Sequence, residues 1–282
     1  MNMASTCKPV VLVPVHRPQP TPDEQFSLKR CGQLLGSHPI RIVHPDGLNL
    51  EAYRDLLPTA KPFSVPVAWM ASIQAYNRMM INPAFYSQFD QFSHVLVHEP
   101  DALVISDQLI YWCEQPFDYI GAPWFLGTSA AAQDAPIIGV GNSGFSLIKI
   151  MAIRRLLESK HRWISRSLIA KELLRKFRRL PSRYSFAYLF GVLGYSGLLC
   201  GAHRVLDMHW DIFLSFHASS GFPLEFKIAD PHSAMHFSWE VNPVRCAELC
   251  SNCPPFGIHA WARYNRDFVQ TLLHCSLGTD LG

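Results

Sequence analysis

The chain has 282 residues, of which 49% are hydrophobic and 17% are charged. This balance excludes a globally disordered chain and supplies enough apolar material for a packed core. The net charge of +3 is unevenly distributed, because residues 154–183 contain eleven basic and two acidic side chains. That block carries +9 and the remainder of the chain carries −6, so we expect the block to face an anionic surface.

The cysteine content and the amino terminus bear on the compartment. Eight cysteines in a chain of this size do not suggest a disulfide framework. The segment Met1–Lys8 has a single basic residue, and the apolar run Val10–Val15 is only six residues long, so no signal peptide is visible. We therefore expect a reducing, cytoplasmic environment.

The first hundred residues alternate between strand-like and helix-like segments. Short β-branched runs that end in polar turns are typical of buried strands, and apolar residues at helical spacing are typical of amphipathic helices. The expected strands are Val10–Val15, Pro39–Val43 and His94–Ile105, and the expected helices are Asp23–Leu35, ended by Gly36, and Trp69–Ile81. This order predicts an α/β fold with a central, mostly parallel sheet flanked by helices, with ligands beyond the carboxyl ends of its strands.

The second half of the chain is less regular. Helical spacing predicts helices over Leu147–Leu157 and Ile164–Leu180, the second of them strongly basic. The segment Ser185–Ala202 is apolar but interrupted by glycines, and it is slightly short for a bilayer span of about 20 residues. We interpret it as a core or interfacial segment, with a membrane-dipping hairpin as the alternative. No linker divides the chain, so we expect one domain over residues 1–282 with a basic and apolar helical insertion at 154–202.

Two carboxylates interrupt the third expected strand. Glu99 and Asp101 directly follow an apolar run, and burying two acids at a strand end costs free energy unless a cation compensates them. Mn²⁺ and Mg²⁺ take carboxylate oxygens and bridge a diphosphate at the same time. The triplet is therefore suited to hold a nucleotide diphosphate through a divalent metal; a solvated turn is the alternative interpretation.

Three stretches of the chain resemble a GT-A-like glycosyltransferase family of microbial proteins, catalogued as a domain of unknown function and found among polysaccharide-biosynthesis genes. At the acidic motif the family usually has Gln-Leu-Asp-Ala, where this chain has Glu99-Pro100-Asp101-Ala102, so Asp101 matches best. The matching motifs are Ser72–Met79, His98–Ala102 and Asp118–Trp124 in the first stretch, Val140–Leu147 in the second, and Pro255–Trp261 in the third.

The resemblance implies a GT-A-like nucleotide-sugar-binding fold and a hexosyltransferase-like, inverting enzyme. Such an enzyme transfers a sugar from a nucleotide-sugar donor to a glycan or lipid-linked acceptor. It uses Mn²⁺ or Mg²⁺, for which Asp101, Glu99 and the late histidine, His259, are the expected ligands, because a neutral imidazole suits Mn²⁺. A histidine hydrogen-bonded in the core is the alternative for His259.

The segment Gly141–Gly144 carries two glycines, which let a backbone pass close to a ligand. It lacks the spacing and the lysine of a Walker phosphate loop, so we expect it to line a sugar or acceptor pocket, with an ordinary turn as the alternative. We expect the nucleotide near residues 14–17. The expected substrate-binding residues are Pro14, His16, Trp124, Asn142, Gly144 and Trp261.

The candidate catalytic base is Asp211. An inverting transfer needs an ionised carboxylate to remove the proton of the acceptor hydroxyl. The family usually shows Glu-Asp at this place, and this chain has Trp210-Asp211. A helix-capping aspartate is the alternative interpretation of Asp211, and the altered motif favours a second function, a non-catalytic glycan- or nucleotide-binding protein of the same fold.

Two further patterns suggest other chemistry. Cys246, Cys250 and Cys253 with His259 have a spacing that lacks a clear fourth cysteine for zinc, so a zinc-dependent hydrolase is only a third hypothesis. The basic block has few interleaved aromatic residues, and we expect no nucleic-acid partner. Peripheral contact with an anionic membrane explains the block more simply, and a solvated helix face is the remaining alternative.

Overall fold

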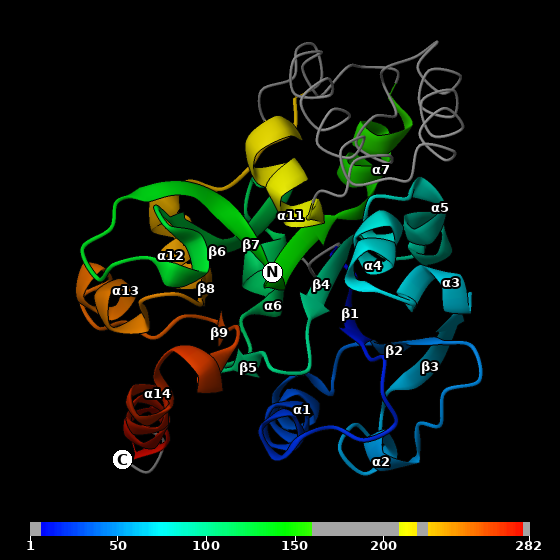
Figure 1. The fold of residues 1–282 in the computed structure, drawn as a ribbon, viewed down its shortest axis with the longest axis horizontal. Helices are drawn as coiled ribbons and strands as arrows, with labels where there is room; N and C mark the ends of the chain where they lie inside the picture. Colours follow the sequence, from blue (N-terminus) through cyan, green and yellow to red (C-terminus); the bar gives the residue numbers. More distant parts are fainter. Residues whose placement is uncertain (1–6, 160–208, 219–224, 279–282) are drawn as a thin grey trace, which may run out of the picture.

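The computed structural model describes residues 7–159, 209–218 and 225–278. In these residues the main sheet has six strands, of which β1 to β4 pair in parallel and β7 runs antiparallel to both of its neighbours (Figure 1). In spatial order they are β3 (Lys61–Val65), β2 (Ile40–Pro45), β1 (Pro9–Pro14), β4 (His94–His98), β7 (Ile137–Lys149) and β6 (Tyr119–Phe125). The predicted α/β fold with a central, mostly parallel sheet flanked by helices is confirmed.

Helices cover both faces of this sheet (Figure 1). The α-helices are α1 (Pro22–Leu35), α2 (Glu51–Arg54), α3 (Val67–Met70), α4 (Ile73–Met80), α5 (Pro83–Tyr86), α6 (Leu109–Cys113), α7 (Ile150–Glu158), α11 (Trp210–Phe213), α12 (Pro231–Phe237), α13 (Pro243–Leu249) and α14 (Trp261–Gly278). Single 3₁₀ turns cover Ser87–Phe89 and Thr128–Ala130, and a π-helical turn, Leu214–Ala218, follows α11.

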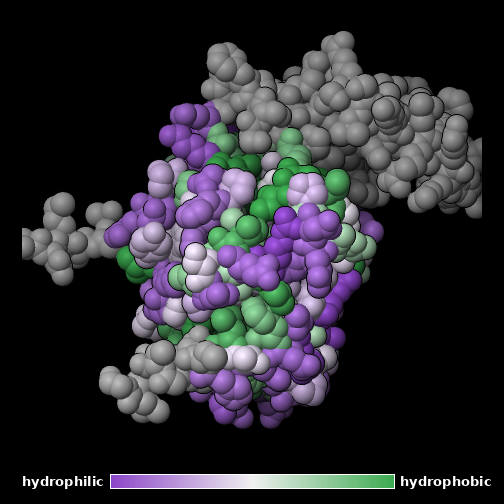
Figure 2. Space-filling model, turned by 90° about the vertical axis from the view of Figure 1, so that its left-hand side faces the viewer, coloured by the Kyte–Doolittle hydropathy of each residue, from purple (hydrophilic) through white to green (hydrophobic). Residues whose placement is uncertain are grey.

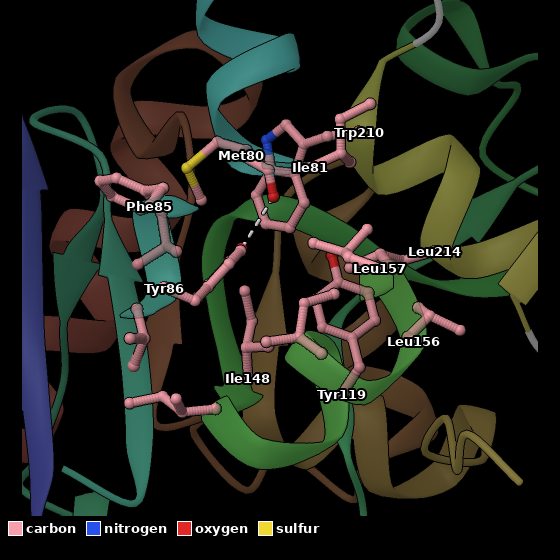
Figure 3. Close-up of a cluster of buried hydrophobic side chains, with 14 of the residues drawn as sticks. Met80, Ile81, Phe85, Tyr86, Tyr119, Ile148, Leu156, Leu157, Trp210 and Leu214 are labelled. Atoms are coloured by element: carbon pink, nitrogen blue, oxygen red, sulfur yellow. Dashed lines mark hydrogen bonds between the residues drawn. The ribbon is translucent and has the colours of Figure 1, made fainter. Parts of the chain in front are cut away.

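The β1 strand shows why its sequence reads as one apolar run. Val10 and Leu12 pack into a core with α4, α5, α7 and α11, which Figure 3 shows around Tyr86. Val11 and Val13 pack into a second core on the opposite face, with α1, α6 and α12. Because both faces are covered, residues 9–13 of the strand are all buried, as is typical of parallel sheets, and only Pro14 at its carboxyl end is partly exposed.

A second, smaller sheet lies beside α1 and α14 (Figure 1). It consists of β5 (Leu103–Val104), β9 (Gly257–Ile258) and β8 (Ser238–Trp239), in that spatial order. β9 pairs antiparallel with β5 and parallel with β8. Its side chains form a third core with α13 and α14, in which Trp239 is fully buried.

Two expected elements in the first half prove to be broken. The helix expected over Trp69–Ile81 is two helices, α3 and α4, because Ser72 is extended and its hydroxyl accepts a hydrogen bond from the Ala75 backbone as an amino-terminal cap. The strand expected over His94–Ile105 is β4 and β5, which belong to different sheets. The turn at residues 99–102 separates them, since the Ala102 N–H donates to the Glu99 carbonyl at 2.8 Å.

The structure differs from two interpretations of residues 141–157. The segment Gly141–Gly144, for which an ordinary turn was the alternative interpretation, lies inside β7, and the helix predicted from Leu147 begins only at Ile150. Leu147 and Ile148 pair with Ile120 and Tyr119 of β6 and are buried on opposite faces of the sheet. Sheet pairing thus overrides the helical spacing of their apolar side chains.

The expected helix Ile164–Leu180 and the apolar segment Ser185–Ala202 lie outside the described residues, as does the basic block beyond residue 159. The predicted insertion at 154–202 and the expected membrane contact therefore fall almost wholly outside them. None of the helices that the structure describes has the length and hydropathy needed to cross a bilayer. Figure 2 shows the face on the side of α12 and α13, where apolar surface lies in separate areas among hydrophilic side chains.

Candidate functional site

A cavity of about 730 Å³ opens at the carboxyl edge of the large sheet. β2 lies on one side of β1 and β4 on the other, so the strand order reverses between β1 and β4. Open α/β sheets bind their ligands at such a reversal, beyond the strand ends. The segments that leave the two strands, Pro14–Arg17 and Glu99–Asp101, both line the cavity, whose volume is in the usual range of a small-molecule site.

Three potential metal ligands converge on the wall of this cavity. The ligand atoms of Glu99, Asp101 and His259 all lie within 4.8 Å of one another, and no other group of three His, Cys, Asp or Glu side chains within the described residues does so. His259 Nε2 is 3.5 Å from Glu99 Oε2 and 3.4 Å from Asp101 Oδ1. An ion with bonds of about 2.1 Å holds neighbouring ligands about 3 Å apart, so small side-chain movements bring all three atoms to one ion.

The small sheet brings these side chains together. Leu103 of β5 pairs with Ile258 of β9, so the residues just before β5 and just after β9 lie side by side at one end of the sheet. Asp101 lies two residues before Leu103, and His259 directly follows Ile258. Gly144 of β7 lies against the imidazole, where an added Cβ would be 2.1 Å from Nε2 and within 2.3 Å of two ring carbons. The ring can occupy its place only because residue 144 has no side chain.

The electrostatics of this group favour a cation. Burial opposes the charged form of His259, but the negative charges of Glu240, Asp101 and Glu99 outweigh it and raise its pKa well above the ordinary value. Burial also opposes the ionisation of Asp101, yet the hydrogen bond and charge of His259 hold its pKa below the usual range. Three carboxylates thus surround one imidazole, and positive charge beyond a single proton is favoured there.

Asp211 lines the same cavity from the start of α11 and is 8% exposed. Its Oδ2 accepts a hydrogen bond from the Ser143 hydroxyl at 2.9 Å, and its Oδ1 accepts one from the Ile212 N–H at 2.7 Å. Burial raises the pKa of Asp211, although both hydrogen bonds act in the opposite direction. The carboxylate is therefore fixed in orientation and more basic than an exposed aspartate, which suits a general base.

A bulge in β7 positions Asn142 and Ser143. The register with β6 shifts between Asn142 and Val140, and Gly141 between them has a φ of +118°. A Cβ at Gly141 would lie 2.4 Å from the Tyr119 ring, so the bulge requires glycine on two counts. Asn142 and Ser143 both line the cavity and are nearly buried.

Other polar groups complete the wall. The Tyr76 hydroxyl lies 3.5 Å from Glu99 Oε1, at the limit of a hydrogen bond. Arg17 forms an ion pair with Glu24, whose backbone N–H and carboxylate also take part in the capping box of α1. Arg263 is exposed and lines both this cavity and an adjoining one of about 310 Å³, with Asp101 between them.

The predicted substrate-binding residues divide into two groups. Pro14, His16 and Asn142 line the cavity, and Gly144 supports the His259 ring from behind. Trp124 and Trp261 are not among the lining residues. The Trp124 indole donates to Ser215, and Trp261 is 3% exposed with its indole N–H donated to Ser27 Oγ at 2.8 Å. Trp261 therefore packs in the interior and offers no face for stacking a sugar in this structure.

Sequence reasoning missed Glu240, Tyr76 and Ser143. Glu240 follows the two-residue strand β8, which is too short to give a periodic signal. Ser143 lies within the motif Val140–Leu147 and Tyr76 within Ser72–Met79. Neither residue has a neighbouring pattern that marks it as a site residue. Only the pairing of distant segments shows that all three line one cavity.

The cysteines on α13 and after it do not form a second site with His259. Burial raises the pKa of Cys246 to about 12 and also raises that of Cys250. Both ring nitrogens of His259 face carboxylates, Nε2 toward Glu99 and Asp101 and Nδ1 toward Glu240. The geometry of the described residues removes the basis for the zinc hypothesis.

Several solved glycosyltransferases are similar to this structure at low sequence identity. Core-mannan synthase A (CmsA/Ktr4) from Aspergillus fumigatus, in its Mn/GDP form, has 10% identity and a TM-score of 0.47 over 81% of this chain and 73% of that one. The mannosyltransferase Ktr4p from S. cerevisiae in complex with GDP has 10% identity and a TM-score of 0.44 over 83% and 70%. The galactosyltransferase LgtC, in complex with donor and acceptor sugar analogs, has 13% identity and a TM-score of 0.45 over 94% and 95%.

Family membership rests on the sequence itself. No curated protein matches the chain in sequence. A family model described as "Protein of unknown function (DUF5672)" matches residues 60–259, a range that includes the acidic turn, β6, β7, Asp211 and His259. The chain belongs to the DUF5672 family.

Proposed function

We propose that this chain is a metal-dependent glycosyltransferase of the GT-A type, which transfers a sugar from a nucleotide-sugar donor to a glycan or lipid-linked acceptor. One observation carries the proposal: Glu99, Asp101 and His259 come together in a cavity at the reversal of the strand order, where α/β sheets bind nucleotides. The resemblance of the sequence motifs to a GT-A-like family supports it.

The side chains fit Mn²⁺ or Mg²⁺. Two carboxylates and one imidazole form a mixed oxygen and nitrogen set, which suits these ions and leaves positions for diphosphate oxygens. Glu99, Asp101 and His259 would hold the ion. When bound, it would stabilise the charge that develops on the leaving diphosphate.

Asp211 is the proposed base. Its carboxylate accepts the proton of an acceptor hydroxyl while that oxygen forms a bond to the anomeric carbon of the donor sugar. The bond from that carbon to the diphosphate oxygen breaks, and its electron pair leaves with the nucleoside diphosphate. Ser143 holds one oxygen of Asp211 and the Ile212 N–H holds the other, so the base does not rotate away from the cavity. Attack from the face opposite the leaving group inverts the anomeric centre.

The donor would lie along the carboxyl end of β1. Pro14 and His16 line the cavity there. Glu99 and Asp101 lie beside them, because they follow β4, the strand that pairs with β1. Arg263, at the mouth of the cavity on the side of Asp101, is placed to contact the negative charge of a diphosphate. Asn142 faces the same space with a side chain that both donates and accepts, which suits sugar hydroxyls.

The test is nucleotide release from a panel of UDP-, GDP-, CMP- and dTDP-sugars, with Mn²⁺ or with EDTA. We expect release from one donor only with metal, and loss of that release in Asp101→Ala. A matched control is Asp107→Ala, which removes an acidic residue of the neighbouring loop that does not line the cavity. Donor binding without release in the presence of varied acceptors would favour the non-catalytic alternative, and neither binding nor release from any donor would contradict the proposal.

A further inference from the structure

Glu240 is a buried carboxylate that no part of the proposed reaction uses. It follows β8 directly, is 8% exposed and lines the cavity. Its Oε1 lies 3.4 Å from His259 Nδ1, an ion-pair distance, and neither Nδ1 nor the Glu240 Oε2 makes a hydrogen bond among the described residues. A buried carboxylate is costly unless a specific contact compensates it, so its place beside the imidazole requires an explanation.

The two nitrogens of the His259 ring face different partners. Nε2 faces Glu99 and Asp101, at 3.5 and 3.4 Å, and Nδ1 faces Glu240. A neutral imidazole has one N–H donor and one nitrogen with a free lone pair, and only the second can bind a metal. An ionised carboxylate only accepts hydrogen bonds, so Glu240 favours the tautomer with the proton on Nδ1 and the lone pair on Nε2.

The backbone enforces this arrangement. Trp239 and Ile258 are register partners in the parallel pair β8 and β9, so the next residues, Glu240 and His259, lie at the same level. The His259 N–H donates to the Trp239 carbonyl at 2.8 Å, which fixes their spacing. With Gly144 against Nε2, the ring is held between the two sheets.

We propose that Glu240 is a positioning residue for the metal site: with the ion bound, a small side-chain movement lets Glu240 accept a hydrogen bond from His259 Nδ1–H, which directs the Nε2 lone pair at the ion shared with Glu99 and Asp101. This inference rests on the metal binding of the proposed function. Carboxylates that contact the second nitrogen of a metal-binding histidine fix its orientation and raise its basicity, and their loss typically lowers metal affinity about 10–100-fold.

The test is Mn²⁺ affinity, measured by the loss of the free Mn²⁺ signal in electron paramagnetic resonance, for the full chain and two variants. We expect Glu240→Leu to raise the Kd for Mn²⁺ about 10–100-fold. Glu240→Gln should raise it less, because the amide oxygen still accepts from Nδ1–H but carries no charge. Glu248→Gln, an exposed acid on α13 outside the cavity, controls for the lost charge and should leave the Kd unchanged.

Two further readouts separate positioning from a structural role. Thermal unfolding without metal should give similar midpoints for wild type and Glu240→Gln, while the stabilisation by Mn²⁺ decreases. In the Mg²⁺-loaded wild type, ¹⁵N NMR should place the proton of His259 on Nδ1, with His259→Gln identifying the signal.

A Kd for Mn²⁺ within twofold of wild type in both Glu240 variants overturns the inference while the proposed function stands. If Glu240→Leu does not fold, an unchanged Kd in Glu240→Gln is sufficient to overturn it. A wild-type chain that binds no Mn²⁺ contradicts the metal site itself and therefore both proposals.

Discussion

The large sheet and the small sheet contribute differently to this molecule. β1, β2 and β3 follow one another along the chain and pair with their sequence neighbours, whereas the small sheet joins segments at residues 103, 238 and 257. The β1 strand has six residues, all apolar, and the β4 strand has five residues, all buried. The strands of the small sheet have only two residues each. The large sheet supplies two of the three cores, and the small sheet fixes the spacing of three charged side chains at the site.

This difference between the two sheets explains where the charged side chains of the site lie. Glu240, His259 and Asp101 all lie within two residues of the ends of the small strands, where backbone pairing fixes their spacing but the side chains reach the cavity. Acids within the large sheet would lie in apolar surroundings and be costly. If the account is right, changes to the charged residues at the ends of the small strands, and to the loops and the part of β7 that face the cavity, alter function with little effect on stability. Changes in the buried interior of the large sheet do the reverse.

The largest effect on activity is expected for Asp211→Asn. Removing a general base typically lowers the rate about 10²–10⁴-fold, or about 3–5 kcal/mol of barrier, because asparagine cannot take the acceptor proton. Steady-state nucleotide release with a saturating acceptor measures this loss, and Mn²⁺ affinity should stay as in wild type. A kcat within threefold of wild type would show that Asp211 is not the base.

A pH profile sharpens this prediction. Because burial raises the pKa of Asp211, kcat should decline on the acid side at a pH above that of an ordinary aspartate. The Ser143 hydroxyl lowers this pKa, so Ser143→Ala should move the acid limb to still higher pH. An acid limb that does not move in Ser143→Ala would argue against this role of the hydrogen bond.

A second expected effect lies in the large sheet and concerns stability alone. Burial lowers the pKa of His94, at the start of β4, to about 4, with a smaller contribution from Lys149. The unfolded chain therefore binds a proton at higher pH than the folded one, and stability decreases as the pH falls from about 6.5 to about 4. The loss attributable to His94 is at most about 3 kcal/mol.

Urea unfolding of His94→Asn between pH 7 and pH 4 checks this. The variant should lose less stability on acidification than wild type, because asparagine does not titrate and retains a group that can bond the Ser93 hydroxyl. Identical pH dependence in the two proteins would mean that His94 is not the source. Activity per folded molecule at pH 7 should be unchanged.

Part of the strand and helix pattern of the first half was predictable because it is local. Val10–Val15 is apolar on both faces, and the α1 helix has its cap, its apolar spacing and its ending glycine in one stretch. Asp101 and His259 were expected to be ligands through motif resemblance, and the structure brings them together. Glu240 was not predictable, because no local pattern tells that a two-residue strand pairs with β9. The interior position of Trp261 likewise depends on α1, more than two hundred residues away.

A third prediction tests the contact between the two sheets. Gly144→Ala places a Cβ 2.1 Å from the original position of His259 Nε2, so the ring must move. We expect the Kd for Mn²⁺ to rise about 10–100-fold, since a misplaced ligand contributes little to affinity. The double variant Gly144→Ala/His259→Ala should bind no more weakly than His259→Ala alone, because both changes remove the same ligand. Additive losses would show that Gly144 acts elsewhere.

The smallest effect is expected for Tyr86→Phe. The fully buried Tyr86 hydroxyl donates to the Met80 carbonyl at 2.9 Å in the core beneath α4 (Figure 3). Removing it should cost about 1 kcal/mol of stability in urea unfolding, because a buried carbonyl loses its partner. Nucleotide release should be unaffected at pH 7. A large loss of activity with full stability would contradict the claim that this core affects stability and not function.

The central claim is that one divalent ion and a nucleoside diphosphate share the cavity with Glu99, Asp101 and His259. The most direct measurement is a crystal structure of the chain grown with Mn²⁺ and the nucleoside diphosphate whose sugar donor the protein turns over, with anomalous diffraction collected at the manganese edge. The account predicts a single strong anomalous peak within about 2.3 Å of ligand atoms from all three residues, in contact with the diphosphate. Nucleotide bound elsewhere, or a cavity with nucleotide and no anomalous peak beside His259, would contradict it.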